Sequence, residues 1–336
     1  MQNPVTAPHV GIFTRVLDAG SAADRYRKAT EQILLAEELG LDTVWVAQHH
    51  FHEAEGGLPS PLVFLSHIAA RTSRIHVATG IVTLPTEDPV RLAEDAVVLD
   101  VLSGGRLQLG VGSGGNPTAL SAFGRSVEDR RAIYDAGLAT LATALTGGEL
   151  AGGNRLYPAP GTLGERIWEA TFSAEGAERI GGRGNGLLLS RTQPRAPGDD
   201  RTTPQIQQEV VAAYRSALPE GVPERILASR SLAVGADRDR LRTLAHDNLS
   251  RLLTATGQSL TFPTADPDQL LAWHDVHVGT VEEVTASLTA DPILAEVTDI
   301  AFQVHPVDPP HEDTLESIRL IAGGVAPALG WVRSAG

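Results

Sequence analysis

The sequence predicts an α/β fold, a TIM (β/α)8 barrel with long insertions in its C-terminal half. Eight apolar strand-like segments alternate with amphipathic helical patterns along the 336 residues, as in a βα barrel or a doubly wound sheet. Most of these segments are near-continuous apolar runs, which is typical of parallel strands buried on both faces. The count of eight favours the barrel. No linker is evident, so residues 1–336 are predicted to form a single domain.

The expected strands are short and apolar. In chain order they are residues 9–14, 43–47, 75–82, 107–112, 166–172, 186–189, 226–234 and 298–304. Gly80 interrupts the third strand, and a glycine at such a place indicates a bulge, a kink or a close backbone approach. In a βα barrel the functional residues lie at the carboxyl ends of the strands. These ends are therefore where a site is expected.

The expected helices carry recognisable start and stop signals. Ser60 precedes the helix 61–70, while the helix 89–102 begins with proline and ends before Gly104, a typical N-terminal and C-terminal pair. The other expected helices are residues 22–39, 127–145, 203–218, 238–256 and 311–329. Three stretches exceed ordinary connections and supply the insertions, namely 146–165, 190–203 and 257–279.

Composition excludes several classes of function. The chain has 41 Asp+Glu against 27 Lys+Arg, a formal net charge of −14 and no cysteine. Without cysteine there is no disulfide framework, thiolate metal site or cysteine nucleophile. The negative charge argues against nucleic-acid binding, which needs a basic footprint. No apolar run approaches the ~20 residues of a membrane span and no signal pattern is visible, so we expect a cytoplasmic protein without membrane contact.

Three histidines follow the second strand in the segment Gln48-His49-His50-Phe51-His52. Histidine suits acid–base work near neutral pH. Adjacent side chains on an extended chain point to opposite sides, so at most one of His49 and His50 faces the barrel mouth. A metal-dependent hydrolase is an alternative, but the other strand ends lack clustered Asp, Glu and His, so no metal is expected. Surface histidines without a role are the third possibility.

Two glycine-containing turns are candidate binding loops. Residues 110–115 read Gly-Val-Gly-Ser-Gly-Gly, where a flat ring or phosphate can approach the backbone at Ser113 and Gly114; a tight turn explains the pattern equally well. Residues 173–177 read Ser-Ala-Glu-Gly-Ala at a strand-to-helix turn. This turn is either an anion site at a helix start or an ordinary Ser173 cap.

In this order the motifs resemble bacterial-luciferase-like flavin monooxygenases, closest to the FMN-dependent luciferase-like monooxygenase subgroup. The matching segments are residues 46–51, 79–86, 88–91, 93–95 and 99–106, and later 175–177 and 300–305. Residues 9–125 match closely, whereas the remainder matches loosely. The resemblance implies a TIM barrel that binds reduced FMN at the carboxyl ends of its strands.

The resemblance also implies roles for individual residues. His49 matches the family's catalytic histidine and His50 its sensitive neighbour. Thr79, Gly80 and Ile81 match the segment whose cis Gly80–Ile81 bond lies against the isoalloxazine ring. Residues implied to bind the phosphate and the adjoining part of the cofactor are Ser113, Gly114, Ser173, Glu175, Gly176 and Ala177.

Departures from the family pattern concern the phosphate and the cavity. The luciferases place an arginine on the phosphate where this chain has Ser113, so the replacement cation is sought in Arg191, Arg195 or Arg230, with Arg191 as the candidate. The reactive cysteine of light-emitting members is absent, so light emission is not expected.

The expected function is therefore an FMN-dependent monooxygenase that takes reduced FMN from a separate flavin reductase and uses O2 to oxygenate a small organic substrate. Alternatives are a deazaflavin- or flavin-dependent hydride-transfer oxidoreductase of the same superfamily and a non-catalytic flavin-binding protein. The family also implies a homodimer, for which Ile33, Leu34 and residues 61–68 are candidate contacts.

Overall fold

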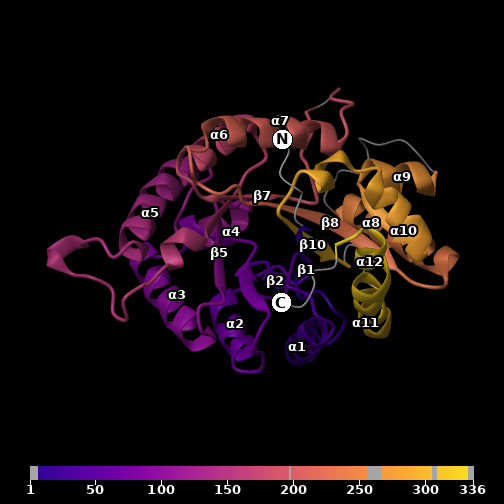
Figure 1. The fold of residues 1–336 in the computed structure, drawn as a ribbon, viewed down its shortest axis with the longest axis horizontal. Helices are drawn as coiled ribbons and strands as arrows, with labels where there is room; N and C mark the ends of the chain where they lie inside the picture. The colour runs from indigo at the N-terminus through magenta and orange to yellow at the C-terminus, as the bar shows by residue number, and fades with distance from the viewer. Residues whose placement is uncertain (1–6, 197, 256–265, 305–308, 332–336) are drawn as a thin grey trace.

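A closed barrel of parallel strands surrounded by helices forms the core of the computed structural model, which describes residues 7–196, 198–255, 266–304 and 309–331 (Figure 1). The ring order is β10-β1-β2-β3-β5-β6-β7-β8, and β8 pairs back to β10. The strands are β1 His9–Thr14, β2 Thr43–Val46, β3 His76–Thr79, β4 Val82–Thr83, β5 Leu107–Gly112, β6 Ile167–Ala170, β7 Gly186–Leu189, β8 Ile226–Val234, β9 Val276–Gly279 and β10 Asp299–Gln303. The predicted TIM barrel is confirmed.

The helices follow one another around the barrel in chain order, from α1 through α5 and α7 to α11 (Figure 1). They are α1 Ala22–Glu38, α2 Pro61–Ala69, α3 Pro89–Ser103, α4 Pro117–Ala122, α5 Arg130–Leu145, α6 Ala174–Gly182, α7 Thr203–Ala217, α8 Arg238–Ala255, α9 Pro267–Trp273, α10 Val281–Thr289, α11 His311–Leu320 and α12 Ala326–Ala328. None of the helices in the described part of the chain combines the length and apolarity needed to cross a bilayer.

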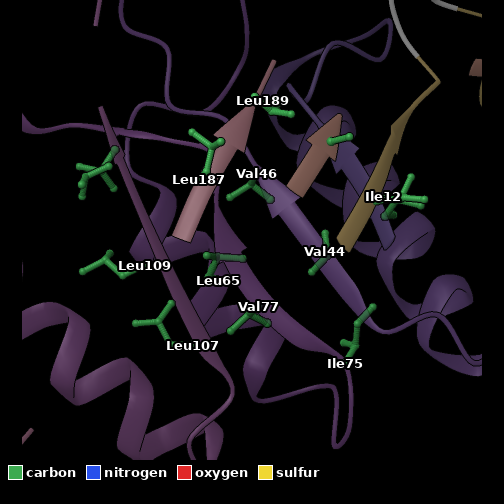
Figure 2. Close-up of a cluster of buried hydrophobic side chains, with 14 of the residues drawn as sticks. Ile12, Val44, Val46, Leu65, Ile75, Val77, Leu107, Leu109, Leu187 and Leu189 are labelled. Atoms are coloured by element: carbon green, nitrogen blue, oxygen red, sulfur yellow. The ribbon is translucent and has the colours of Figure 1, made fainter. Parts of the chain in front are cut away.

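Two apolar layers hold the barrel together. The outward faces of β2, β3 and β5 carry side chains such as Val44, Val77 and Leu107, which Figure 2 shows together with Leu65 of α2. The inward faces carry a separate cluster in which the rings of Trp45 and Trp168 meet edge to face, 5.5 Å between centroids. The barrel centre is therefore filled, and a ligand is confined to the ends of the strands.

The third strand is interrupted where Gly80 predicted an irregularity. β3 and β4 both pair with β5, and the Gly80–Ile81 peptide bond between them is cis, as the resemblance implied. A Cβ atom on Gly80 would lie 2.8 Å from Cε2 of Phe13. Glycine is needed here because the backbone passes this close to a ring on β1.

The insertions contain elements that the sequence did not reveal. β9 pairs in parallel with β8 outside the closed ring, and α9 and α10 flank it. Only four residues long, β9 includes a histidine and a glycine and lacks the apolar run of the barrel strands. The expected residues Thr256 and His305, and most of the first half of 257–279, lie outside the described residues.

One long connection lies at the other end of the barrel from the site. Residues 146–165 run from α5 to β6 and project beyond α5 in Figure 1. A connection that leads from a helix into the next strand returns to the amino end of the sheet, away from the carboxyl ends. Among the expected insertions, 190–203 instead connects β7 to α7 and adjoins the mouth.

Candidate active site

Backbone and apolar rings form the floor at the carboxyl ends of the strands. Phe13 and Ile81 are partly buried against the inner cluster, with Gly80 packed on Phe13. On β5, a Cβ atom at Gly112 would lie 3.0 Å from Cδ1 of Ile81. Neighbouring side chains fill the space beside both glycines, so the strand ends form a packed apolar surface. Such a surface suits the face of a flat aromatic ring, as the predicted flavin requires.

Thr79 links β3 to β5 beside this floor. Its hydroxyl donates to the carbonyl of Gly110 at 2.8 Å and accepts from the Gly110 N–H at 2.9 Å. The side chain is fully buried. Thr79 thus joins β3 to β5 through its side chain, and its predicted cofactor contact stays a prediction.

His49 stands at the end of β2, held by a loop that Arg15 secures. Its backbone N–H donates to Leu58 O at 3.0 Å, and a Cβ on Gly56 would lie 2.6 Å from its Nδ1. Arg15 of the neighbouring β1 end donates to the Glu55 carbonyl, and its Nη2 lies 3.3 Å from Nε2 of His49. Because a guanidinium only donates, Nε2 accepts and the imidazole proton belongs on Nδ1.

The surroundings of His49 keep it neutral. Burial, followed by the charges of Arg15 and Arg191, lowers the pKa of His49 from 6.5 to about 3. Both effects disfavour the imidazolium. At neutral pH His49 is therefore a hydrogen-bond and proton acceptor rather than a charged donor.

The neighbouring histidines make other contacts. The ring of His50 packs edge-on against Phe123, 4.8 Å between centroids, and burial lowers its pKa. His52 hydrogen-bonds Thr118 Oγ1 at 2.8 Å on the surface. His49 alone of the three contacts Arg15, whereas the catalytic role predicted for His50 stays a prediction.

Gln48 is a structural residue of the site that the motif analysis missed. Its Oε1 accepts from the Thr83 N–H at 2.7 Å, while its Nε2 donates to Glu87 Oε1 at 2.7 Å. The burial that raises the pKa of Glu87 also isolates this bond from water. The signal was present, because a buried amide directly after an apolar strand needs partners.

The turn at the start of α6 retains donors for an anion. Ser173 caps the helix by accepting from the Gly176 N–H at 3.2 Å. The N–H groups of Ala174 and Glu175 precede the first intrahelical bond, which Ala177 donates to Ser173 O. The cap and the anion site are thus compatible, and these two N–H groups fit a phosphate.

Ser113 and Gly114 directly follow β5, and β5 pairs with β6, the strand that leads to α6. Gly114 has a positive φ of 65°, and a Cβ there would collide with Cγ2 of Thr83. Glycine is therefore required by both backbone and space. Contacts of Ser113 with a cofactor stay a prediction.

The three candidate cations lie in different places. Arg230 is fully buried on the outer face of β8, where it bonds Asp291 at 2.6 Å and Gln207 at 2.9 Å, so it is removed from the mouth. Arg195 stacks on Trp273, 4.2 Å from its ring centroid. Arg191 follows β7.

The side chain of Arg191 bonds to β10. Its Nε donates to Gln303 Oε1 on β10 at 2.9 Å, and β10 stands across the ring from β5. It is also near enough to His49 to lower the pKa of that histidine. A phosphate contact by Arg191 stays a prediction that this placement does not favour.

Two further features concern the described residues away from the strand ends. Within residues 7–196, 198–255, 266–304 and 309–331, no three metal-binding side chains converge. A groove of about 820 Å³ lies between α1, α2 and α11, lined by residues such as Leu34, Val63 and Leu315. It is outside the barrel wall, so it is distinct from the strand-end site.

A family model and several curated relatives match this chain. The family model described as luciferase-like monooxygenase matches residues 9–290. A 4-hydroxyprotoasukamycin monooxygenase of Streptomyces nodosus subsp. asukaensis is 38% identical over 113 residues, 34% of this chain and 30% of the relative. An alkanal monooxygenase alpha chain of Photorhabdus laumondii is 33% identical over 120 residues, 36% of this chain and 33% of the relative. The matched segments span about half or less of these curated relatives.

Solved structures match over nearly the whole chain. The monooxygenase RslO1 from Streptomyces bottropensis has a TM-score of 0.78 and 26% identity, covering 95% of this chain and 98% of that one. The oxygenating constituent of 3,6-diketocamphane monooxygenase from Pseudomonas putida, in complex with FMN, has a TM-score of 0.77, 17% identity and coverages of 96% and 99%. An F420-dependent secondary alcohol dehydrogenase has a TM-score of 0.70, 17% identity and coverages of 96% and 99%. At these lower identities the likeness concerns the fold.

Proposed function

Since the chain belongs to the luciferase-like monooxygenase family, we propose that it is an FMN-dependent monooxygenase. It would take reduced FMN from a separate flavin reductase and use O2 to oxygenate a small organic substrate. The observation that carries the proposal is the neutral His49 beside a floor made of Gly80, Ile81 and Phe13. A proton acceptor next to a surface that accepts a flat ring is the arrangement that such a reaction needs.

Reduced FMN, when bound, would supply the electrons and the reaction with oxygen. The residues of this chain bind it, orient it and exclude water from it. The α6 start, with the N–H groups of Ala174 and Glu175, would hold the phosphate. Gly80 and Ile81 would support the ring from below, and the apolar side chains of the floor would keep water away.

His49 would move the proton. Its Nε2 is the basic atom, and it accepts from Arg15 in the resting arrangement. Once Nε2 carries a proton, both partners are donors, so Arg15 has to release it. Arg15 is therefore a positioning residue that fixes the tautomer of His49 and adds to the effect of burial in lowering its basicity.

The deazaflavin-dependent dehydrogenase is the second candidate, because an F420-dependent enzyme shares the fold at a TM-score of 0.70. Anaerobic titration of the protein with FMN, reduced FMN and reduced deazaflavin separates the two. We expect reduced FMN to saturate the protein at one per chain. Saturation by reduced deazaflavin alone would favour the dehydrogenase over the monooxygenase. The absence of turnover with bound FMN would favour a non-catalytic flavin-binding protein.

A homodimer is also part of the proposal, and an exposed apolar face supports it. Val98, Val101 and Leu102 share one face of α3, and Val63 is exposed on the neighbouring α2. Among the contacts expected from the sequence, Ile33 and most apolar side chains of 61–68 pack on the barrel instead. Light scattering is expected to give twice the chain mass, and Leu102→Glu is expected to give a monomer. A wild-type protein with the mass of one chain would contradict the proposed homodimer.

The remaining partners follow from the same chemistry. A small organic substrate and O2 would reach the site through the mouth. Supply of reduced flavin by a reductase favours the cytoplasm as the compartment.

A further inference from the structure

Three buried polar groups on the inner wall of the barrel lack hydrogen-bond partners in the described part of the chain. They are Oγ of Ser229, Oγ of Ser231 and Nε2 of Gln303. The three residues are 4%, 1% and 0% exposed. Buried polar groups are nearly always hydrogen-bonded, so a cluster of three indicates that something polar meets them.

The three side chains share one surface. Ser229 pairs with Ala301, and Ser231 pairs with Gln303, in the register of β8 and β10. Leu227 and Ala301 belong to the inner cluster of the barrel. Because every second residue of a strand faces the same side, Ser229, Ser231 and Gln303 form one inner wall near the carboxyl ends of the two strands.

Arg191, which follows β7, contacts this wall. Its Nε donates to Gln303 Oε1 at 2.9 Å, so the amide oxygen is used while the amide NH2 remains. Arg191 is only half-buried, whereas Gln303 is fully buried. An amide, a guanidinium and two hydroxyls make the wall rich in donors, and its ligand must therefore offer acceptors.

The electrostatic surroundings favour a negatively charged acceptor. Arg191 is among the charges that lower the pKa of His49 to about 3 and that of His274 to about 4. No group with the opposite effect is among the causes for either histidine. The positive charge of Arg191 therefore acts on both histidines, although the chain carries a net charge of −14.

We propose that Arg191, Gln303, Ser229 and Ser231 form a subsite for a planar anion with oxygen acceptors. The planar guanidinium and the amide suit such a group better than a neutral ketone. This inference rests on the proposed function for its biological meaning, and it adds the chemical class of the ligand. The same chemistry has two sources, a carboxylate on the substrate and the anionic pyrimidine edge of reduced flavin.

The subsite also has a consequence for His49. A negative charge beside Arg191 offsets one of the charges that, after burial, hold the pKa of His49 down. Binding of the anion would therefore make His49 a stronger base when the ligand is present. This links ligand binding at β8 and β10 to proton transfer at β2.

Calorimetry with acetate and benzoate tests the substrate source on the full chain without flavin or oxygen. We expect both to bind, Arg191→Gln to weaken binding at least tenfold, and Ser231→Ala to weaken it several-fold. Ser66→Ala is the matched control, because that hydroxyl bonds Leu62 O within α2. Far-UV circular dichroism checks that each variant is folded.

Potentiometry of bound FMN tests the flavin source. If the wall binds the pyrimidine edge of reduced flavin, Arg191→Gln should lower the preference for reduced over oxidised FMN about tenfold. This corresponds to about 30 mV for a two-electron couple. In that case acetate and benzoate should not bind. Unchanged carboxylate affinity and unchanged potential in both variants mean that the wall meets water only, and the proposal is then wrong. Carboxylate binding can be measured even if FMN does not bind. The proposed subsite and the proposed FMN-dependent function can therefore be refuted independently.

Discussion

At the scale of single residues, His49 and Arg15 act as a pair, of which the sequence predicted only the histidine. The histidine was predicted from its place at a strand end and from the family motif. Arg15 directly follows β1, and its contact with Nε2 of His49 at 3.3 Å depends on how β1 and β2 align. Partners brought together by the closed ring are not visible in a linear motif.

Replacing the histidine tests its role in proton transfer. We expect His49→Ala to lower turnover about 10²- to 10⁴-fold, the usual range for one acid–base group, with the affinity for FMN changed by less than threefold. Steady-state kinetics and fluorescence titration measure the two quantities. His52→Ala, on the surface, is the control, and equal losses in both variants would contradict the assignment.

The floor makes a separate prediction at Gly80. A Cβ atom there would meet Phe13 at 2.8 Å, so we expect Gly80→Ala to cost about 1–3 kcal/mol of unfolding free energy and to weaken FMN binding. Urea unfolding and FMN titration are the measurements. Gly182→Ala has no atom within 4 Å of the new Cβ. It should leave FMN binding unchanged and should not lower stability, because alanine is favoured over glycine in a helix. A Gly80→Ala variant as stable as the wild type would mean that Phe13 moves aside at little cost, which would contradict the explanation.

At the scale of elements, the barrel strands were predictable because each is an apolar run buried on both faces. The bounds of β1, β5, β7 and β8 agree with the expected ones. β9 was not predicted, because it lies outside the ring. For α6 only the start at Ser173 was predicted, because its glycines obscure the helical pattern. The placement of Arg191 and Arg230 was not predicted either, since strand alternation sends Arg230 outward on β8.

The outward arginine makes the prediction that belongs to this scale. Arg230 links β8 to Asp291 and Gln207 inside the outer layer. We expect Asp291→Ala to cost about 3–5 kcal/mol, because it leaves a buried guanidinium without its counter-charge. Chemical unfolding measures the loss. The double variant Arg230→Met/Asp291→Ala should recover part of it, and no recovery would contradict the explanation.

At the scale of the whole molecule, buried neutral histidines set the response to acid. Burial is the first cause that lowers the pKa of His49 to about 3 and the pKa values of His274 and His277 to about 4. The unfolded chain binds protons on these groups below about pH 6.5, whereas the folded chain does not. Folding therefore loses stability as the pH falls from about 6.5 toward 4.

Each such histidine contributes a slope of up to about 1.4 kcal/mol per pH unit in that window. Urea unfolding at pH 7.0, 6.0 and 5.0 should show a falling free energy of unfolding before most carboxylates titrate. His277→Gln should reduce the slope. A free energy that stays constant between pH 7 and 5 would show that these histidines are protonated in the folded protein.

The central claim is that this barrel holds reduced FMN and directs its reaction with oxygen through His49. The most direct measurement is to load the full chain anaerobically with reduced FMN, admit O2, and record flavin reoxidation and oxygen uptake for the wild type and His49→Ala. We predict saturation at one FMN per chain and a time course that differs strongly from free flavin and changes in the variant. Failure to bind reduced FMN, or reoxidation identical to free flavin in both proteins, would contradict it.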